Sequence, residues 1–259
     1  MKKTSKRLSV DRIYDEPNLS GVSIGKIGWR PDGKVLSYIR GSENGNEVRA
    51  QDVTTGQQVT LFDYSRLEPE VTAKKTRIAA AGNLAYHWGP DGNMLLVAAT
   101  GAVPHILNLQ DDQLVPITGN PTPVRDVKLS PNGQFVSFVR GWDLYMADLA
   151  GGREIPLTTG STEAMRSATP DTMGDLLADS GHWWSPDSTQ IAYLQTDERE
   201  VPIFWYADLM SSRGQNIPER YPQAGESIPV IALKVVSARG HRWIDTSAWP
   251  GWYLARVAW

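Results

Sequence analysis

The chain has 259 residues, with 26 Lys and Arg against 29 Asp and Glu, and no cysteine. The lack of cysteine excludes disulfides, thiolate metal sites and a cysteine nucleophile. A formal net charge of -3 provides no electrostatic footprint for nucleic acid or for an anionic membrane, so neither is an expected partner. The 41% hydrophobic share indicates a folded core, and 23 Gly with 17 Pro favour a turn-rich β protein.

The N-terminus begins with a basic segment, residues 1–7, that no apolar run follows. A secretory signal needs about 7–15 apolar residues at this place, and a transmembrane helix needs about 18 or more in a row. Neither pattern occurs. We therefore expect a soluble protein that is cytoplasmic, or periplasmic or secreted if a leader has been removed, with residues 1–23 as an N-terminal extension.

One motif recurs four times along the chain. An aromatic or apolar residue is followed by any residue, by Pro-Asp-Gly or a near variant, and by an alternating β-rich run. Proline presets φ in a tight turn, and Asn/Asp-Gly supplies the positions that need a positive φ, so each copy predicts a β-hairpin. The copies begin at Trp29, Trp88, Leu129 and Trp184.

The third copy contains most of one structural unit. Its β-rich runs at 124–129, 134–140, 142–148 and 155–157 are separated by turn residues. This spacing predicts a four-stranded antiparallel meander.

Repetition of such units predicts an all-β fold, a β-propeller built of about four blades plus the first strand of a fifth. The Gly-His and Trp-Asp marks of WD repeats do not recur at fixed offsets, which disfavours that class. We expect short helical insertions near 66–81 and 163–180, and a partial propeller over 24–259 with blades at about 24–64, 83–118, 124–158 and 181–236.

The C-terminal residues 252–259 read as the start of a further blade. Trp259 would be the first residue of a further copy of the motif, the position of Trp29, Trp88 and Trp184. We therefore expect a chain that is truncated within a repeat.

The tryptophans divide into two groups. Trp29, Trp88 and Trp184 recur in register and are expected to pack between blades, because each aromatic side chain buries a large area. Trp249 and Trp252 flank a Pro-Gly pair and are candidates for exposed contact.

The sequence contains no recognisable catalytic site. The one G-x-S-x-G match, at residues 21–25, precedes a strand and not the helix that a nucleophilic serine requires. Of the four histidines, His87 and His182 occupy a repeated position beside the blade tryptophan, where packing is the expected role. We expect no catalytic residue, no metal ligand set and no cofactor.

The residues from Trp142 onward resemble the propeller domain of the dipeptidyl peptidase IV family of serine exopeptidases. The most specific features are the double tryptophan before a Ser-Pro-Asp turn at 183–187 and the block Tyr221-Pro222-Gln223-Ala224-Gly225. Between them lies Asp197-Glu198-Arg199-Glu200-Val201-Pro202, which also agrees in order. The likeness extends over Asp11 to Trp259.

The resemblance implies an enzyme that removes N-terminal dipeptides, usually with proline second. Such enzymes join a propeller of about eight blades to an α/β-hydrolase domain with a Ser-Asp-His triad. This chain would form the first part of the propeller, be inactive alone, and have peptide N-termini and the hydrolase domain as partners.

The family's propeller binds the substrate ammonium with a Glu-Glu pair on a short insertion before the double tryptophan. The pair falls at Gly174-Asp175 or Met173-Gly174, so at most one acid, Asp175, remains. If the alignment is shifted, Asp171 or Glu163 takes part. We expect the amine site to be lost. In the alternative interpretation, Asp171, Asp175 and Asp179 simply lie on the solvent-exposed face of a helix.

Two hypotheses for the function follow. The chain is a propeller portion of an exopeptidase that gates or binds peptide substrate, or it is a stand-alone, non-catalytic binding or scaffold module. An incomplete propeller exposes sheet edges, which invites closure through residues 253–257 or association of two copies.

Overall fold

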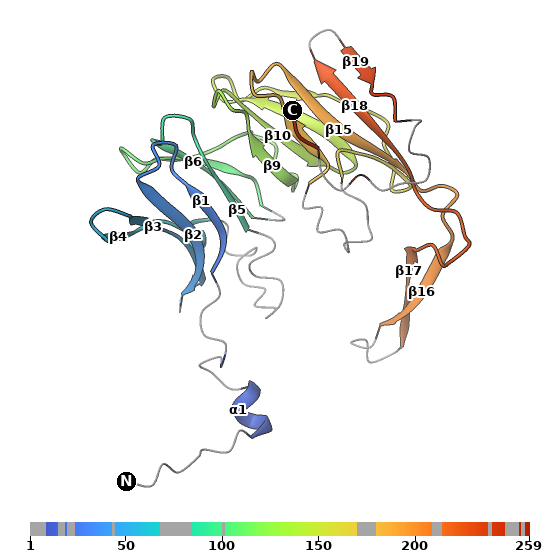
Figure 1. The fold of residues 1–259 in the computed structure, drawn as a ribbon, viewed down its shortest axis with the longest axis horizontal. Coiled ribbons are helices and arrows are strands. Elements are labelled where there is room, and N and C mark those ends of the chain that lie inside the picture. Colours follow the sequence, from blue (N-terminus) through green and yellow to red (C-terminus); the bar gives the residue numbers. More distant parts are fainter. Residues whose placement is uncertain are drawn as a thin grey trace.

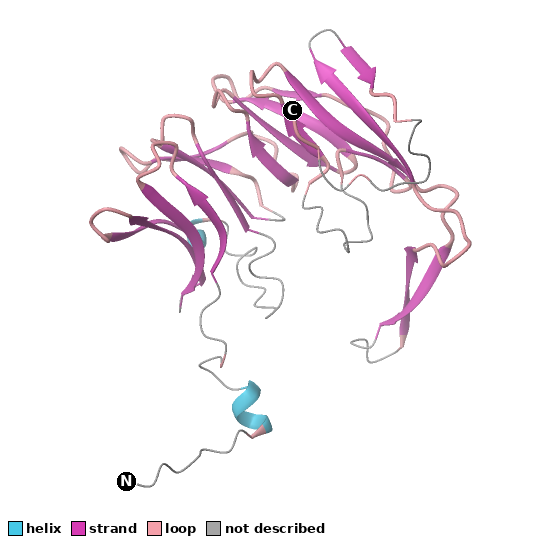
Figure 2. Cartoon of the chain, viewed as in Figure 1, coloured by secondary structure: helices cyan, strands magenta, loops and turns pink. Residues whose placement is uncertain are grey.

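The computed structural model of the chain describes residues 9–14, 19, 24–42, 45–67, 84–99, 102–169, 180–208, 214–237, 240–246, 254 and 257–259. Strands dominate these residues (Figure 2). A short helix, α1 (Val10–Tyr14), stands away from the sheets on the N-terminal side (Figure 1).

Three successive four-stranded antiparallel sheets follow the chain order strand by strand. In each sheet the first strand lies at one edge and the fourth at the other, so the predicted meander is confirmed. The strands are β1 (Ile24–Trp29), β2 (Val35–Ser42), β3 (Gly45–Asp52) and β4 (Gln58–Asp63); β5 (Leu84–Trp88), β6 (Met94–Ala99), β7 (His105–Asn108) and β8 (Leu114–Pro116); and β9 (Arg125–Leu129), β10 (Phe135–Arg140), β11 (Asp143–Asp148) and β12 (Glu154–Pro156).

The fourth sheet departs from this pattern because its first strand is divided. Both β13 (Met165–Ser167) and β14 (His182–Trp184) pair antiparallel with β15 (Gln190–Asp197). The sheet then continues through β18 (Val230–Ser237) to β19 (Gly240–Trp243).

A separate two-stranded hairpin, β16 (Ile203–Asp208) and β17 (Gln215–Arg220), projects from the fourth sheet between β15 and β18 (Figure 1). Its exposed side chains include Trp205 and Ile217.

The predicted helical insertions are corrected where the structure describes them. Within 163–180, residues Met165–Ser167 form strand β13, because they pair with the end of β15. The 66–81 insertion begins after one 3-10 turn, η1 (Tyr64–Arg66), which Asp63 caps by accepting from Ser65 N at 2.8 Å. Residues 68–83 and 170–179, and residues 252, 253, 255 and 256 of the predicted fifth-blade strand, lie outside the described residues.

The four repeated turns adopt the predicted conformation. The last residue of each turn has a left-handed φ: 70° at Gly33, 71° at Gly92, 72° at Gly133 and 61° at Ser188. In the first, second and fourth turns, the turn aspartate accepts from the backbone N–H two residues later, as Asp32 does from Lys34 at 3.0 Å. Asn132 replaces this aspartate in the third turn and makes the same bond to Gln134. Local turn chemistry therefore determines the hairpins.

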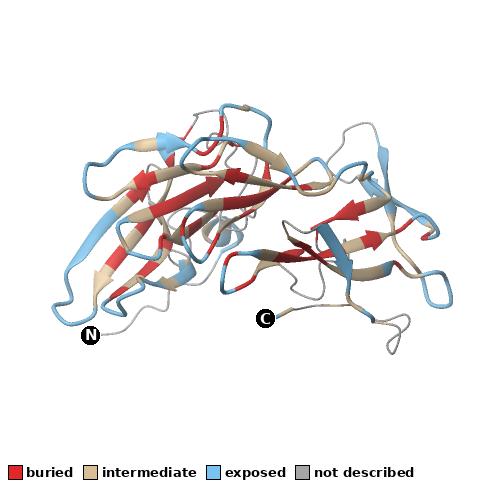
Figure 3. Ribbon diagram, turned by 90° about the horizontal axis from the view of Figure 1, so that it is seen from above, coloured by how far each residue is buried: buried red, intermediate tan, exposed pale blue. Residues whose placement is uncertain are grey.

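Consecutive sheets pack face to face around three hydrophobic clusters. The first joins Ile39 and Phe62 of the first sheet to Leu95 of the second, and the second joins Leu96 to Phe138 of the third. The third cluster joins Leu144 to Ile191 of the fourth sheet. These buried positions form the central red segments of the strands in Figure 3, so the core lies between sheets.

Two of the three repeated tryptophans pack as predicted. Trp88 packs on the first cluster, and Trp184 stacks on Phe135 with ring centroids 6.3 Å apart. The prediction that Trp29 packs between sheets is wrong, because Trp29 is 56% exposed. The side chain at this position packs on the sheet that precedes its own, and in the described part of the chain no sheet precedes β1.

Replacing turn glycines with alanine should separate backbone strain from steric clash. An alanine Cβ at Gly33 meets no atom within 4 Å, whereas at Gly133 it lies 2.7 Å from Pro90 Cδ. We expect Gly33→Ala to lower the free energy of unfolding by about 1–2 kcal/mol. Gly133→Ala should lower it by at least about 1 kcal/mol more. Urea denaturation of both variants tests this expectation, and equal losses would contradict it.

Candidate functional site

The first strands of the four sheets, β1, β5, β9 and β14, lie along one edge of the array and border a shared hollow of about 680 Å³, which we call the inner-strand hollow. Its walls combine tryptophans, the prolines of three repeated turns and a few polar side chains. The lining residues are Lys26, Ile27, Gly28, Trp29, Pro31, Tyr86, His87, Trp88, Pro90, Lys128, Leu129, Ser130, Pro131, Trp183 and Trp184.

One repeated position contributes a different residue to the hollow in each sheet. This is the residue just before the tryptophan or leucine that begins each repeated motif. In every sheet it pairs with the third residue of the strand that follows the turn. In chain order this position holds Gly28, His87, Lys128 and Trp183, and all four line the hollow. The repeat therefore supplies a common backbone on which the chemistry varies.

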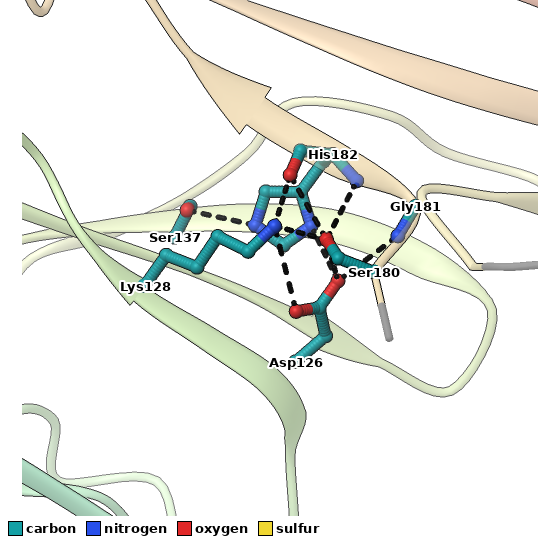
Figure 4. Close-up of polar contacts among 6 residues, drawn as sticks. All are labelled: Asp126, Lys128, Ser137, Ser180, Gly181 and His182. Carbon is teal, nitrogen blue, oxygen red and sulfur yellow. Dashed lines mark hydrogen bonds and ion pairs between the residues drawn. The ribbon is translucent and has the colours of Figure 1, made fainter. Parts of the chain in front are cut away.

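A polar network joins the third sheet to the fourth beside this hollow (Figure 4). Asp126 Oδ2 accepts from Ser180 Oγ at 2.8 Å and from Gly181 N at 3.2 Å. Lys128 Nζ donates to Ser180 Oγ and to the His182 carbonyl, and lies 3.6 Å from Asp126 Oδ1. The Asp126 and Lys128 side chains are 13% and 19% exposed, so the pair is largely removed from water.

His182 completes the network and has no solvent-exposed surface. Its Nδ1 lies 3.1 Å from Asp126 Oδ2, and its Nε2 lies 2.9 Å from Ser137 Oγ. With the proton on Nδ1, the Ser137 hydroxyl can donate to Nε2, and Nδ1 faces the Asp126 carboxylate at ion-pair distance but without the alignment of a hydrogen bond. The prediction that His182 is a packing residue agrees with its complete burial.

The contacts of Ser137, His182 and Asp126 follow the order of a Ser-His-Asp triad. A nucleophile must also reach its substrate. The Ser137 residue is 0% exposed and lies in the middle of β10. The three residues therefore form a structural link between sheets.

Burial dominates the electrostatics of this network. It lowers the pKa of His182, so the ring is neutral at pH 7, and it also lowers the pKa of Lys128. Burial alone would raise the pKa of Asp126. The neighbouring His182 ring, the Lys128 ammonium and the Ser180 hydroxyl outweigh burial and lower that pKa below its ordinary value of 3.8.

His87 stands one residue before the turn tryptophan, at the position that Lys128 holds in the third sheet, and its ring faces β9 of that sheet. Burial lowers the pKa of His87 below its ordinary value of 6.5, the Lys128 ammonium acts in the same direction, and Asp126 opposes both. The Val127 carbonyl accepts a hydrogen bond from the ring. Lys26, on the exposed side of β1, also faces this histidine across the hollow.

The binding residues expected from the sequence are not among the described residues that line the hollow. Asp171 and Asp175, and with them Trp249 and Trp252, lie outside the described residues, so their predicted roles stay predictions. Glu163 is described and lies exposed in the turn before β13.

Sequence reasoning missed the charged residues of the hollow. Lys26, Asp126 and Lys128 lie on inner strands, at fixed offsets before the turn motif, as Asp-Val-Lys at 126–128 shows. Aligning the four copies by their turns would have placed Lys26 in register with Asp126, and Lys128 in register with His87.

No candidate metal site and no candidate membrane-spanning helix occur among the described residues. Within them, no group of three or more His, Asp or Glu side chains could hold a metal ion. No helix in the same part of the chain is long and apolar enough to cross a bilayer.

Stacked meander sheets with a hollow on their inner strands define a propeller-like all-β domain. The chain belongs to the family described as the dipeptidyl peptidase IV (DPP IV) N-terminal region, which matches residues 90–259. The predicted resemblance is thereby confirmed.

Individual relatives agree with this assignment. The chain is 32% identical over 120 residues to a probable dipeptidyl-aminopeptidase B of Emericella nidulans, covering 40% of this chain and 13% of the relative. It is 24% identical over 208 residues to the prolyl endopeptidase FAP of Bos taurus, covering 78% of this chain and 27% of the relative. The chain thus spans less than a third of the length of these relatives.

The fold is also similar to that of a solved structure. The crystal structure of Porphyromonas gingivalis dipeptidyl peptidase 4 matches with a TM-score of 0.67 at 18% identity, over 86% of this chain and 32% of that one.

Proposed function

We propose that residues 24–259 are the N-terminal propeller portion of a dipeptidyl-peptidase-like serine exopeptidase, non-catalytic by itself, and that the inner-strand hollow binds peptide. The observation that carries the proposal is the hollow itself, bordered by the first strands of four sheets of a chain in this family. The printed names of the relatives, a dipeptidyl-aminopeptidase and a prolyl endopeptidase, support peptide as the ligand class.

The lining suits a peptide. Trp29 and Trp183 offer broad apolar surfaces, and Pro31, Pro90 and Pro131 present rigid rings between them. Aromatic surfaces bind extended and proline-containing chains through contacts that need little loss of side-chain freedom. Polar groups at the edge of the hollow can then orient the bound chain.

Peptide binding by the full chain is tested by titrating its tryptophan fluorescence with short proline-containing peptides. We expect a saturable change, and we expect Trp29→Ala to weaken binding about tenfold, which corresponds to about 1.4 kcal/mol. Trp243→Ala is the matched control, because Trp243 is similarly exposed, at 64% against 56%, and lies outside the hollow. Equal losses in the two variants would contradict the proposed site.

The non-catalytic part of the proposal has its own assay. Incubation of the chain with a chromogenic Gly-Pro amide should release no chromophore above the buffer rate. Turnover that copurifies with the chain would overturn this part and leave peptide binding to be judged by the fluorescence titration.

A further inference from the structure

We propose that the inner-strand hollow binds a carboxylate group, held by the Lys26 ammonium with His87 beside it. This inference rests on the proposed peptide binding and names the class of peptide: one with a carboxylate near an apolar segment.

The described side chains that line the hollow carry more positive than negative charge. These residues include two lysines, Lys26 and Lys128, and no acidic residue, while Asp126 lies close enough to His87 to act on its charge. Lys128 is fully engaged by Asp126, Ser180 and the His182 carbonyl. Lys26 is exposed and has no ion pair among the described residues. One positive charge in the hollow is therefore left to attract an anion.

The backbone of β1 has an unusual conformation at Lys26. Lys26 has a φ of 50°, within an irregularity where the β1–β2 register shifts between Gly25 and Gly28. Bulges of this kind redirect a side chain, and a left-handed φ at a residue other than glycine costs roughly 1–2 kcal/mol. The surrounding sheet must hold this strained conformation.

The same irregularity recurs in β9, where its effect is visible. Asp126 stands at the position equivalent to Lys26, has a φ of 47°, and lies where the β9–β10 register shifts. There the bulge aims a charged side chain into a polar network with the next sheet. By analogy, the β1 bulge aims the Lys26 ammonium toward the second sheet, where His87 lies.

The surroundings of Lys26 strengthen its attraction for an anion. Trp29 and Trp183 form apolar walls of the same hollow that Lys26 lines. A charge pair is stronger beside low-dielectric walls than in open water. A carboxylate on a peptide would therefore meet the ammonium while its apolar part meets the tryptophans.

His87 adds a second donor that depends on pH. The charged groups that face it are Lys26 of β1 and Asp126 and Lys128 of β9. Its pKa lies below 6.5, so the ring is neutral at pH 7 and gains a proton as the pH falls through that pKa. A protonated ring favours the carboxylate, so the affinity should rise toward acidic pH while the carboxylate stays ionised.

Four versions of one peptide test the inference on the full chain at low salt. The peptide has an acetylated N-terminus and carries either Glu or Gln at one position and either a free or an amidated C-terminus. We expect the Gln amide, which has no carboxylate, to bind at least about fivefold more weakly than the best acidic version. Comparing the Glu amide with the Gln free acid shows whether the side chain or the C-terminus supplies the carboxylate.

Lys26→Met should remove the preference for acidic peptides, and Lys34→Met should retain it. Lys34 is the control because it is an exposed lysine in the neighbouring turn, outside the hollow. His87→Asn should remove the rise in affinity from pH 8 to pH 5.5.

Three different results would contradict carboxylate recognition, the role of Lys26, or peptide binding as a whole. Equal affinity for all four peptides overturns carboxylate recognition and leaves peptide binding standing. Retention of the preference in Lys26→Met overturns the assignment to Lys26. Failure of every version to bind overturns the proposed function together with this inference.

Discussion

Replacing Asp126 with alanine should lower the free energy of unfolding by about 3–5 kcal/mol, because it leaves the Lys128 ammonium buried without its counter-ion. The variant also loses the bonds that Asp126 accepts from Ser180 Oγ and Gly181 N. These bonds hold the start of β14 against the third sheet (Figure 4). Urea denaturation followed by tryptophan fluorescence measures the loss.

Asp91→Ala is the matched control for this prediction. Asp91 accepts from Asn93 N at 3.0 Å in an exposed turn, so its loss should cost only about 1 kcal/mol. A second variant, Asp126→Ala combined with Lys128→Met, removes both charges and should be less destabilised than Asp126→Ala alone. Equal stability of Asp126→Ala and Asp91→Ala would show that the network does not join the sheets.

The contribution of Asp126 should depend on pH with a definite sign. Its pKa in the folded protein lies below the ordinary 3.8, so the carboxylate stabilises the fold fully above the unfolded pKa. That contribution disappears as the pH falls through the folded pKa. The stability difference between the wild type and Asp126→Ala should therefore be constant above about pH 5 and shrink below about pH 4.

The second large effect is expected at Glu198, which lies just after β15 and is 1% exposed. Its carboxylate pairs with the Arg166 guanidinium of β13, and the Arg166 residue is 5% exposed. Glu198→Ala leaves a buried guanidinium without this carboxylate, so we expect a loss of about 3–5 kcal/mol in the free energy of unfolding. Thermal and urea denaturation both report this change.

A double variant separates the charge effect from simple loss of packing. Arg166→Met combined with Glu198→Leu removes both charges and keeps apolar volume, so it should recover most of the stability. Glu200→Ala is the surface control, since Glu200 is exposed in the next turn. A double variant as unstable as Glu198→Ala would mean that the two side chains act independently of each other.

The hairpins were predictable because their cause is local. Pro-Asp-Gly and its variants set the φ of Gly33, Gly92, Gly133 and Ser188, and the turn Asp or Asn bonds the backbone two residues on. The divided first strand of the fourth sheet was not predictable in this way. Met165–Ser167 has only three strand residues, and its pairing partner Gln195–Asp197 lies about 30 residues further along the chain.

The candidate site was predictable only in part. The position of His182 beside the blade tryptophan indicated packing, which its burial bears out. Its partners Asp126 and Ser137 come from two other strands, and nothing in the local sequence around His182 names them. The charged residues of the inner strands had a signal, their offset from the turn motif, that becomes visible once the four copies are aligned.

The amino-acid sequence by itself determined that this is an all-β chain of repeated meander sheets in the dipeptidyl peptidase IV family, because turn chemistry and alternation act between neighbouring residues. Only the tertiary structure decided what each sheet interface contains. Ser37 and Ser137 hold equivalent positions and bond Trp88 and His182 of the next sheet, whereas Leu96 at the same position packs in an apolar cluster. These contacts join residues about 45–50 positions apart, and their nature depends on the side chain that the neighbouring sheet presents, so only sheet packing creates the inner-strand hollow.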